Sequence, residues 1–270
     1  MIIVKVMGGL GNQLFQYVFG RVLSIRLKKQ VYYDISEYYL SSTNIKRELV
    51  LNQFPNIIAK YVNSKLVKLA LKLNIAKTIR EKNFSFIKFE QSPYIINYLN
   101  GYWQDYNYIN EFRTTICNEL FMPSMVKNKY YDRIKHSNSV SLHIRLSDYL
   151  LPQNQNIYHQ LSLKYYTDSI DLINLNIGKP TIFVFSDDIE KSKIILNSIK
   201  GEIVFVDDNS SFIEDFGLMR MCSHNIIANS TFSWWAAWLN QYNNKTVIAP
   251  KQWYKDRVID NIYPNKWIQI

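Results

Sequence analysis

Polar and charged side chains recur where apolar segments end in the second half of the chain. His143 and Arg145 are two residues apart on a predicted strand, so their side chains leave on the same face, and Asp148 follows. Ser186-Asp187-Asp188 ends the next apolar segment, and Asn229-Ser230-Thr231 stands between a predicted strand and a predicted helix. A guanidinium and the N–H groups of a helix N-terminus both suit phosphate oxygens. These residue types together favour a site for a nucleoside pyrophosphate.

Each of these elements also has a purely structural interpretation. Asn229-Ser230-Thr231 could be a simple N-cap, Asp187 and Asp188 could cap the next helix, and Arg145 could pair with Asp148. His143 could be a core histidine. The functional interpretation is favoured because the carboxyl ends of parallel strands meet at one edge of a sheet.

The sequence gives little support for metal chemistry. There is no Asp-x-Asp triplet, and none of the four histidines has zinc-like spacing to another histidine or a cysteine. We therefore expect no metal and no cofactor. If a diphosphate leaves here, positive charge must come from Arg145 and the helix terminus.

The elements that must position these residues alternate between strand and helix. Residues 2–6 predict a buried strand, Gly8 to Gly11 a tight turn, Asn12 an N-cap, and 31–33 the next strand of a βαβ unit. The second half predicts strands at 140–144, 181–185, 202–206, 225–228 and 246–249, with helices at 164–175, 189–199, 212–221 and 232–240. This alternation predicts parallel α/β sheets. We expect two domains, 1–135 and 136–270, although 35–135 shows no clear period.

Composition is that of a folded protein, since 47% of residues are hydrophobic and 20% are charged. No apolar run approaches the ~20 residues needed to cross a bilayer, and the opening segment does not resemble a signal peptide. The two cysteines, Cys117 and Cys222, show no disulfide-framework spacing. We expect a cytoplasmic protein with reduced thiols.

The net charge of +10 favours an anionic partner. Basic residues gather between 65 and 82, interleaved with leucines, in a pattern typical of an amphipathic helix. Two interpretations stay open: an ordinary solvated face, or a surface in peripheral contact with anionic lipid at the inner face of the membrane. A nucleic-acid partner is disfavoured because no recognisable binding module is present.

Several ordered motifs resemble glycosyltransferase family 11, the α-1,2-fucosyltransferases. They are the opening from Gly8 to Gln16 (Gly-Gly-Leu-Gly-Asn-Gln-Leu-Phe-Gln), the segment from His143 to Tyr149, and the run from Leu218 to Trp235. Gly101-Tyr102-Trp103-Gln104 and Tyr165-Tyr166 also match. The resemblance extends over about residues 5–250, and the 218–235 run is its most specific part.

The resemblance implies a GT-B-like fold, two Rossmann-type domains facing a cleft, with GDP-fucose held mainly by the C-terminal one. It implies an inverting, metal-independent transfer of L-fucose to the 2-hydroxyl of a terminal β-galactoside, the galactose-terminated end of a surface-glycan or O-antigen precursor. Arg145 would bind the β-phosphate, with His143, Asp148 and Asn12 as the other catalytic candidates. The candidate donor-binding residues are Gly11, Gln13, Asp187, Asp215, Asn229, Ser230 and Thr231.

One departure from the family pattern concerns the position after Arg145. Relatives commonly carry two adjacent arginines there, whereas this chain has Leu146. The arginine expected at the phosphate is retained, so the predicted activity stands. The loss of the second arginine puts donor affinity and the placement of Asp148 in question.

Two other functions are compatible with parts of the sequence. Gly9 and Gly11 after a strand, with Asp34 further on, echo a dinucleotide-binding fingerprint, but Leu14 replaces its third glycine. A dehydrogenase would also leave the Arg145 and Ser230 region without a role. A sugar-binding relative without catalysis is the other alternative, and consumption of GDP-fucose would exclude it.

Overall fold

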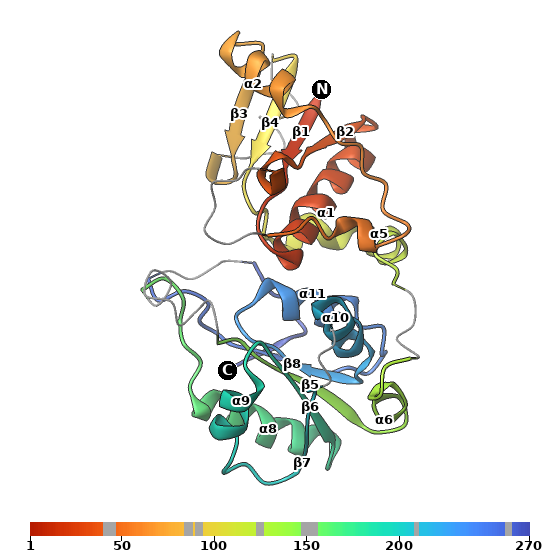
Figure 1. Cartoon of the computed structure of the whole chain (residues 1–270), viewed down its shortest axis with the longest axis vertical. Helices are drawn as coiled ribbons and strands as arrows, with labels where there is room; N and C mark the ends of the chain where they lie inside the picture. The colour runs from red at the N-terminus through yellow and green to blue at the C-terminus, as the bar shows by residue number, and fades with distance from the viewer. Residues whose placement is uncertain are drawn as a thin grey trace. The chain divides into compact units, whose positions relative to one another are not determined.

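The computed structural model describes residues 1–39, 47–83, 89, 94–122, 127–146, 156–207, 211–256 and 261–270. The chain forms two compact units, Met1–Met122 and Pro123–Ile270 (Figure 1). The boundary lies before the predicted one at residue 135 because the segment after residue 127 binds the second unit. The Tyr130 hydroxyl donates to the Phe205 carbonyl at 3.0 Å, and the Arg133 guanidinium donates to Glu202 at 2.8 Å.

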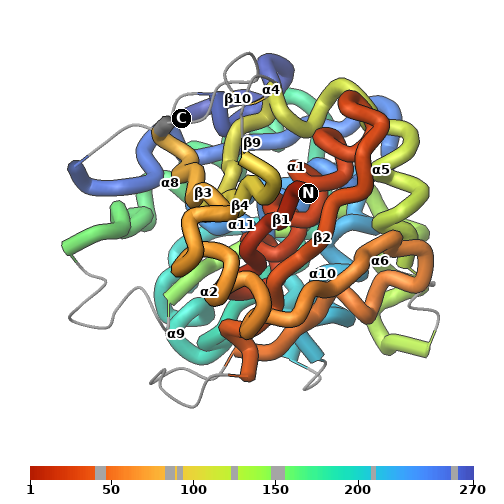
Figure 2. Tube along the Cα trace, turned by 90° about the horizontal axis from the view of Figure 1, so that it is seen from above, coloured from red at the N-terminus to blue at the C-terminus, as the bar shows by residue number. Residues whose placement is uncertain are grey.

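The first unit is built on a four-stranded parallel sheet in the order β2-β1-β4-β3. Figure 2 shows these strands side by side from above. The elements are β1 (Ile2–Lys5), α1 (Leu10–Leu27), β2 (Val31–Asp34), α2 (Ser64–Lys72), β3 (Ala76–Arg80), β4 (Ile96–Asn100), α4 (Tyr106–Ile109) and α5 (Arg113–Glu119). Short 3-10 turns occur at Ser36–Tyr39, Leu51–Gln53, Glu81–Asn83 and Asn110–Phe112.

The turn between β1 and α1 differs from the prediction in one detail. The prediction that Asn12 is the N-cap is wrong: Gly9 is the N-cap, and the Gln13 N–H already donates to the Gly9 carbonyl at 3.0 Å. Gly8 has φ of +80°, a left-handed conformation that favours glycine. Asn12 therefore lies in the first turn of the helix, where its side chain is available for contacts outside the helix.

The basic 65–82 segment is helical only in its first half. α2 ends at Lys72, and the chain then enters β3, so Lys77 and Arg80 lie on a strand. Lysine and leucine spacing predicted the helix correctly, but the β-branched Thr78 and Ile79 that follow favour a strand. The prediction of one continuous amphipathic helix is therefore wrong beyond residue 72.

The second unit has a six-stranded parallel sheet in the order β10-β9-β8-β5-β6-β7. The predicted alternation of strands and helices is confirmed, with boundaries shifted by a few residues. The elements are α6 (Tyr131–Lys135), β5 (Ser139–Ile144), α8 (Leu163–Ile177), β6 (Thr181–Ser186), α9 (Ile189–Ile195), β7 (Glu202–Phe205), α10 (Phe212–Met221), β8 (His224–Ile226), α11 (Thr231–Leu239), β9 (Val247–Ala249) and β10 (Ile268–Gln269).

The central strand β5 is buried along its whole length but has two chemically different faces. Val140, Leu142 and Ile144 belong to an apolar cluster that includes Tyr166 of α8. The alternate residues are polar, and Ser141 accepts a hydrogen bond at 2.7 Å from the buried Asn225 of β8. Since side chains alternate along a strand, one face of β5 anchors α8 and the other carries polar groups.

Tryptophans fill much of the core of the second unit. Trp234, Trp235 and Trp238 of α11 are at most 1% exposed, and neighbouring ring centroids lie 5.1–6.3 Å apart. The Trp234 indole donates to the Ile262 carbonyl at 2.8 Å. This packing fixes the axis of α11 and hence the position of its N-terminus. Among the described helices, none is both long and apolar enough to cross a membrane.

Candidate functional site

The strand order of the second unit places the predicted donor residues at one point of the sheet edge. The chain runs outward from β5 to β6 and β7, then returns to β8 on the other side of β5. The carboxyl ends of β5 and β8 therefore flank the topological switch point, where open α/β sheets bind ligands. Arg145 directly follows β5, and Asn229-Ser230-Thr231 follows β8.

Arg145 is held by a carboxylate from the neighbouring strand. Its Nη1 lies 3.2 Å from Oδ2 of Asp187, and the other oxygen of Asp187 accepts the Leu146 N–H at 2.9 Å. Asp187 thus fixes both the side chain of Arg145 and the backbone that carries it. Both side chains are about one-fifth exposed, 24% for Arg145 and 20% for Asp187, so the pair is reachable by a ligand.

Leu146 follows Arg145, at the position where the sequence resemblance led us to expect a second arginine. Its side chain packs against the apolar cluster formed by β5, β6 and α8. It also lines a pocket of about 330 Å³, together with Arg145. The substitution therefore places an apolar side chain beside the phosphate-binding candidate.

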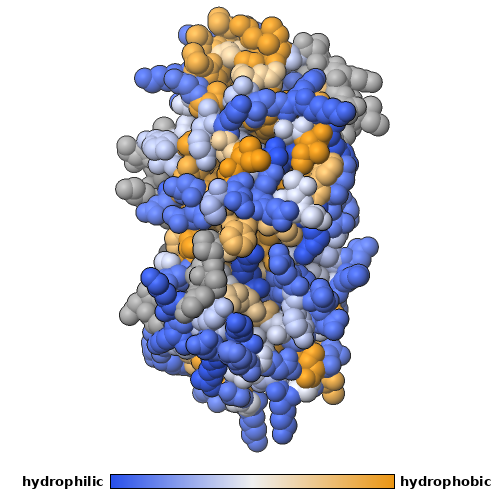
Figure 3. Space-filling view, turned by 90° about the vertical axis from the view of Figure 1, so that its right-hand side faces the viewer, coloured by the Kyte–Doolittle hydropathy of each residue, from blue (hydrophilic) through white to orange (hydrophobic). Residues whose placement is uncertain are grey.

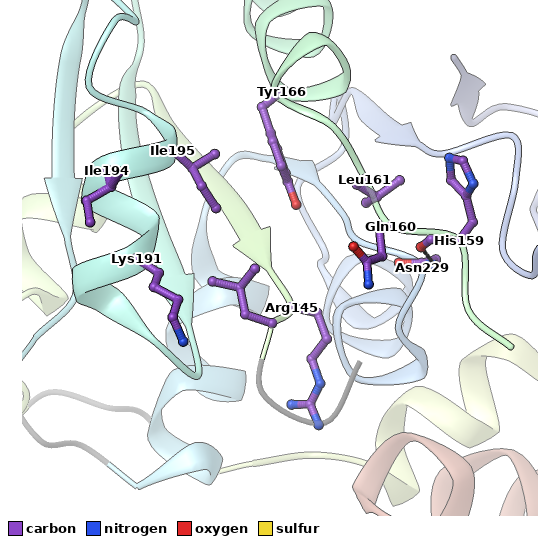
Figure 4. A pocket seen from close by; sticks show the side chains of 10 residues that line it. Arg145, His159, Gln160, Leu161, Tyr166, Lys191, Ile194, Ile195 and Asn229 are labelled. Atoms are coloured by element: carbon purple, nitrogen blue, oxygen red, sulfur yellow. Dashed lines mark hydrogen bonds between the residues drawn. The ribbon is translucent and has the colours of Figure 1, made fainter. Parts of the chain in front are cut away.

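The pocket next to Arg145 lies within the second unit, and Figure 4 shows its lining from close by. Tyr166 of α8 and Ile195 of α9 supply apolar walls, and Lys191 of α9 adds a cation. The pocket is lined by Arg145, Leu146, His159, Gln160, Leu161, Tyr166, Lys191, Ile194, Ile195 and Asn229. Burial raises the pKa of Tyr166 above its ordinary value, so this phenol stays neutral. The combination of apolar walls and cations suits a ligand with both anionic and apolar parts.

Asp188, unlike Asp187, caps the next helix, which was the structural interpretation considered for both residues. It is the N-cap of α9 and accepts the Lys191 N–H at 3.0 Å. Its carboxylate also pairs with the Lys191 ammonium at 2.8 Å, and this contact lowers the pKa of Asp188. The two adjacent aspartates thus have different roles: Asp187 binds Arg145, and Asp188 caps α9.

His143 lies under the switch point and is 4% exposed. Its ring is 5.7 Å from that of Phe232, which in turn meets Phe216 of α10 edge-on at 5.4 Å. Asp215 precedes Phe216 on α10, a helix whose start is fixed by a Ser211 and Glu214 capping box. The structure thus brings β5, α10 and α11 together around this aromatic contact.

The N-terminus of α11 has a hydroxyl that does not cap its helix. Ser230 is the N-cap residue, yet its side chain makes no capping hydrogen bond. The simple N-cap interpretation is therefore wrong for the Ser230 hydroxyl. Thr231 opens the helix and is partly exposed. Helix N-terminal N–H groups with a nearby hydroxyl form a ready site for a phosphate.

Asn229 holds two loops together beside this helix. Its amide nitrogen donates to the carbonyls of His159 and Trp253, both at 2.8 Å, and the side chain is 1% exposed. The same two residues are joined by a backbone hydrogen bond of 3.1 Å. Asn229 therefore shapes the wall of the pocket through its contacts with these loops.

The first unit repeats the same arrangement at its own switch point, between β1 and β4. Asn12 follows β1, Gln104 follows β4, and the Gln104 amide donates to Asn12 Oδ1 at 2.9 Å. Gln13 is fully buried; it donates to the Gly8 and Glu48 carbonyls and accepts the Val50 N–H. Gly11 is buried in the same helical turn.

A carboxylate that the sequence analysis missed organises the loop after β4. Glu81 accepts the Tyr102 N–H at 2.9 Å and the Gln104 N–H at 3.2 Å. Between them, Trp103 has φ of +59° and is fully buried, stacked on Phe19 at 4.2 Å. Left-handed backbone in a large residue persists only where the surroundings enforce it. Glu81 and Phe19 thus fix the loop that carries Gln104, whose side chain contacts Asn12.

Asp34, the acid expected to hold a ribose in a dinucleotide site, has other partners. It is 4% exposed, and its two oxygens accept the Tyr98 hydroxyl at 2.9 Å and the Ser36 N–H at 3.0 Å. Leu14, at the third glycine position, is fully buried. These contacts disfavour the dehydrogenase alternative.

Comparisons with known proteins identify the family of this chain. The sequence model of glycosyl transferase family 11 matches residues 1–270. The chain belongs to glycosyl transferase family 11. An Escherichia coli alpha-1,2-colitosyltransferase is 31% identical, covering 100% of this chain and 99% of the relative. The E. coli O-antigen biosynthesis glycosyltransferase WbnK is 30% identical over 97% and 98%, and a Sus scrofa galactoside alpha-(1,2)-fucosyltransferase 2 is 24% identical over 52% and 45%.

Solved structures support the fold. NodZ alpha-1,6-fucosyltransferase, soaked with GDP-fucose, aligns with a TM-score of 0.50 at 12% identity over 88% of this chain and 91% of that chain. The predicted GT-B-like α/β class is confirmed by this likeness and by the two parallel sheets. At such identity the likeness concerns the fold alone.

The structure brings most of the predicted residues to two sheet edges. Arg145, Asp187, Ser230 and Thr231 gather at the switch point of the second unit, and Gly11, Asn12 and Gln13 at that of the first. Asp148 lies outside the described residues. Sequence reasoning missed Glu81, Lys191 and the pocket lining at 159–161.

Proposed function

We propose that the chain is an inverting transferase that moves L-fucose from GDP-β-L-fucose to the 2-hydroxyl of a terminal β-galactoside. The observation that supports this proposal is that Arg145 and the α11 N-terminus follow two adjacent strands, β5 and β8, at the switch point of the second unit. Both groups stabilise negative charge, as a departing GDP requires. The names of the relatives support an α-1,2 linkage to a glycan acceptor.

The proposed reaction is a single displacement. The acceptor oxygen forms a bond to the anomeric carbon as the bond to the GDP oxygen breaks, so a β-linked donor gives an α-linked product. The transition state has oxocarbenium character, and negative charge grows on the β-phosphate. Arg145 neutralises that charge, with the Ser230 and Thr231 region beside it. The hydroxyl proton passes to a base, for which Asp148 stays the candidate.

No metal takes part in this proposal. The positive charge that stabilises the leaving group comes from Arg145, with Lys191 as a second cation in the adjoining pocket. Addition of EDTA should leave the rate unchanged. A rate that falls with EDTA and returns with Mg²⁺ or Mn²⁺ would contradict this part of the mechanism.

A second donor is favoured by one comparison. One relative that matches the whole chain is named a colitosyltransferase, and colitose is L-fucose without its 3-hydroxyl. The pocket beside Arg145, which has Leu146, Leu161 and Ile195 in its lining, is compatible with a deoxygenated sugar. GDP-colitose is therefore the alternative donor to GDP-fucose.

The test is incubation of the purified chain with GDP-fucose or GDP-colitose, EDTA and a panel of β-galactosides. GDP release and product linkage by NMR are followed together. An α-1,2-linked product from GDP-fucose would support the first proposal, and a clear preference in kcat/KM for GDP-colitose would replace it with the second. Absence of both turnover and calorimetric GDP binding would overturn the donor assignment altogether, and tight NADH binding would revive the dehydrogenase alternative.

A further inference from the structure

An exposed apolar stripe runs along α2 of the first unit. Leu66 and Leu69 of α2 and Leu73, its C-cap residue, are 63%, 52% and 57% exposed. Their spacing of three and four residues places them on one side of a helix. The buried side of α2 is a different one, because Val67 packs with Ile3 and Tyr98 against the sheet. The leucine stripe therefore contributes nothing to the core of the unit.

A stripe of lysines lies directly beside the leucines. Lys65, Lys68 and Lys72 each precede one of the three leucines and repeat the same spacing, so they form a parallel stripe about 100° around the helix. All three are exposed, and the described structure pairs none of them with an acid. The helix thus has three sides: a buried one, an apolar one and a cationic one.

The apolar stripe continues onto the adjoining end of the sheet. Ile75 and Ile95 precede β3 and β4 and are 39% and 71% exposed, and Met1, before β1, is 47% exposed. Backbone hydrogen bonds join them, from the Met1 amino group to the Ile95 carbonyl and from the Ile96 N–H to the Ile75 carbonyl. Figure 3 shows apolar surface gathered at the top of the view, the end at which Figure 1 draws α2.

We infer that this α2 surface, formed by Met1, Leu66, Leu69, Leu73, Ile75 and Ile95 with the bordering lysines, docks on an anionic lipid bilayer. The leucines and isoleucines enter the headgroup region, and the lysines contact anionic headgroups. The Lys77 ammonium lies 5.2 Å from the centre of the Tyr94 ring at the same end, adding an amphipathic pair suited to an interface.

The charge pattern favours a bilayer over other occupants. A second copy of the chain docked on this surface would bring two lysine stripes of like charge together, with no negative charge to neutralise them. A nucleic acid would neutralise the lysines but would leave the leucines in water. An anionic bilayer satisfies both stripes, and the net charge of +10 adds long-range attraction to it.

This docking sets the direction in which the proposed active edge faces. The α2 surface lies at the amino ends of β1, β3 and β4, whereas Asn12 and Gln104 follow the carboxyl ends of β1 and β4. A strand of four or five residues spans roughly 15 Å. The switch point of the first unit is therefore held away from the lipid, where it meets a sugar chain that projects from the membrane. This consequence rests on the proposed function, but the docking itself does not.

Vesicle co-sedimentation of the full chain tests the docking. We expect the wild type to bind vesicles of phosphatidylcholine with phosphatidylglycerol, to bind pure phosphatidylcholine at least tenfold less, and to lose binding as salt rises. Changing the leucines (L66S/L69S/L73S) should lower binding at least tenfold at low salt. Changing the lysines (K65Q/K68Q/K72Q) should remove the preference for phosphatidylglycerol.

Matched controls come from exposed residues outside α2. Leu175 of α8 is 83% exposed, and Leu175→Ser should bind as the wild type does. The triple variant K29Q/K135Q/K200Q removes the same charge from other exposed positions and should keep most of the preference for phosphatidylglycerol. Thermal melts confirm that each variant is folded.

Two results would overturn the docking. One is a wild type that ignores phosphatidylglycerol vesicles, or leucine variants that bind them as the wild type does. The other is a wild-type dimer in analytical ultracentrifugation that the leucine changes dissociate, which would assign the surface to self-association. Vesicle binding is measured without substrates, so its result does not depend on whether the proposed transferase activity is correct.

Discussion

Asp187 binds Arg145 and the N–H of Leu146 at the same time, through different oxygens. The carboxylate thereby joins the ends of β5 and β6 and sets the direction of the guanidinium. The sequence suggested a contact between Asp187 and the donor itself. The geometry instead gives Asp187 a role in positioning Arg145. Kinetics can distinguish this positioning role from direct binding of the donor.

Replacing Arg145 with alanine should slow turnover strongly. If the guanidinium stabilises the departing GDP, kcat should fall roughly 10²–10³-fold, because loss of one preorganised group at the developing charge has effects of that size. Steady-state rates with GDP-fucose and a β-galactoside measure it. Near-normal turnover would remove Arg145 from the mechanism.

Asp187→Asn should have a smaller effect of the same kind. The asparagine keeps an oxygen for the Leu146 N–H but loses the charge that holds the guanidinium. We expect kcat to fall by roughly 10–100-fold, because a misplaced catalytic group costs up to that much. Asp188→Asn is the matched control, since asparagine can still cap α9 and the change removes only the charge paired with Lys191, so kcat should change little. Additive losses in the Arg145→Ala/Asp187→Asn double variant would show that the two residues act independently.

Glu81→Gln tests the loop that carries Gln104. One amide oxygen and one NH₂ group cannot accept both N–H groups that the carboxylate now accepts, so the Gln104 contact with Asn12 should loosen. We expect a higher KM for the acceptor or a lower kcat, by roughly tenfold. Gly101→Ala should act similarly, because its Cβ would lie 2.6 Å from the Cβ of Glu81. Glu111→Gln, which removes only an exposed ion pair with Arg26, should behave as the wild type.

The burial of His224 predicts that the folded protein loses stability in acid. Burial lowers its pKa below the ordinary 6.5, and its Nδ1 accepts the Thr246 N–H at 2.9 Å, which requires an unprotonated nitrogen. The unfolded state therefore binds a proton that the folded state resists, so stability is full above pH 6.5 and falls as the pH drops through and below that value. Denaturant midpoints between pH 8 and about 5 measure the slope.

Two variants isolate the contribution of His224 to that slope. His224→Asn should flatten it, because the new side chain does not titrate. His136→Asn, at an exposed position, should leave it unchanged. Equal slopes in all three proteins would assign the acid sensitivity to other groups.

The elements of the second unit follow from local patterns that the sequence shows directly. Apolar runs bounded by Ser, Asp or Gly predicted β5, β6 and β7. The predicted helix at 212–221 has the same bounds as α10, whose start the structure shows to be capped by Ser211 and Glu214. The pairing of β8 with β5 is a long-range choice that no local pattern contains. The switch point, and with it the placement of Arg145 and Ser230 at the ends of adjacent strands, therefore needed the structure or the family resemblance.

The first unit was less predictable for a physical reason. Its strand β3 is mostly exposed and carries Lys77 and Arg80, and β4 is interrupted by Asn97, so both lack the continuous apolar runs that mark buried strands. The role of Glu81 depends on two backbone N–H groups about twenty residues away. The positive φ of Trp103 is likewise imposed by packing, and no sequence rule predicts it in a tryptophan.

The tryptophans are divided unevenly between the units. Of six, only Trp103 lies in the first unit, and the other five lie in the second. Indole emission from the whole chain therefore reports mainly on the second unit, and Trp103→Phe makes it report on that unit alone. Comparing the fluorescence melts of the two proteins would show whether the units lose their structure in one transition or in two, without separating them.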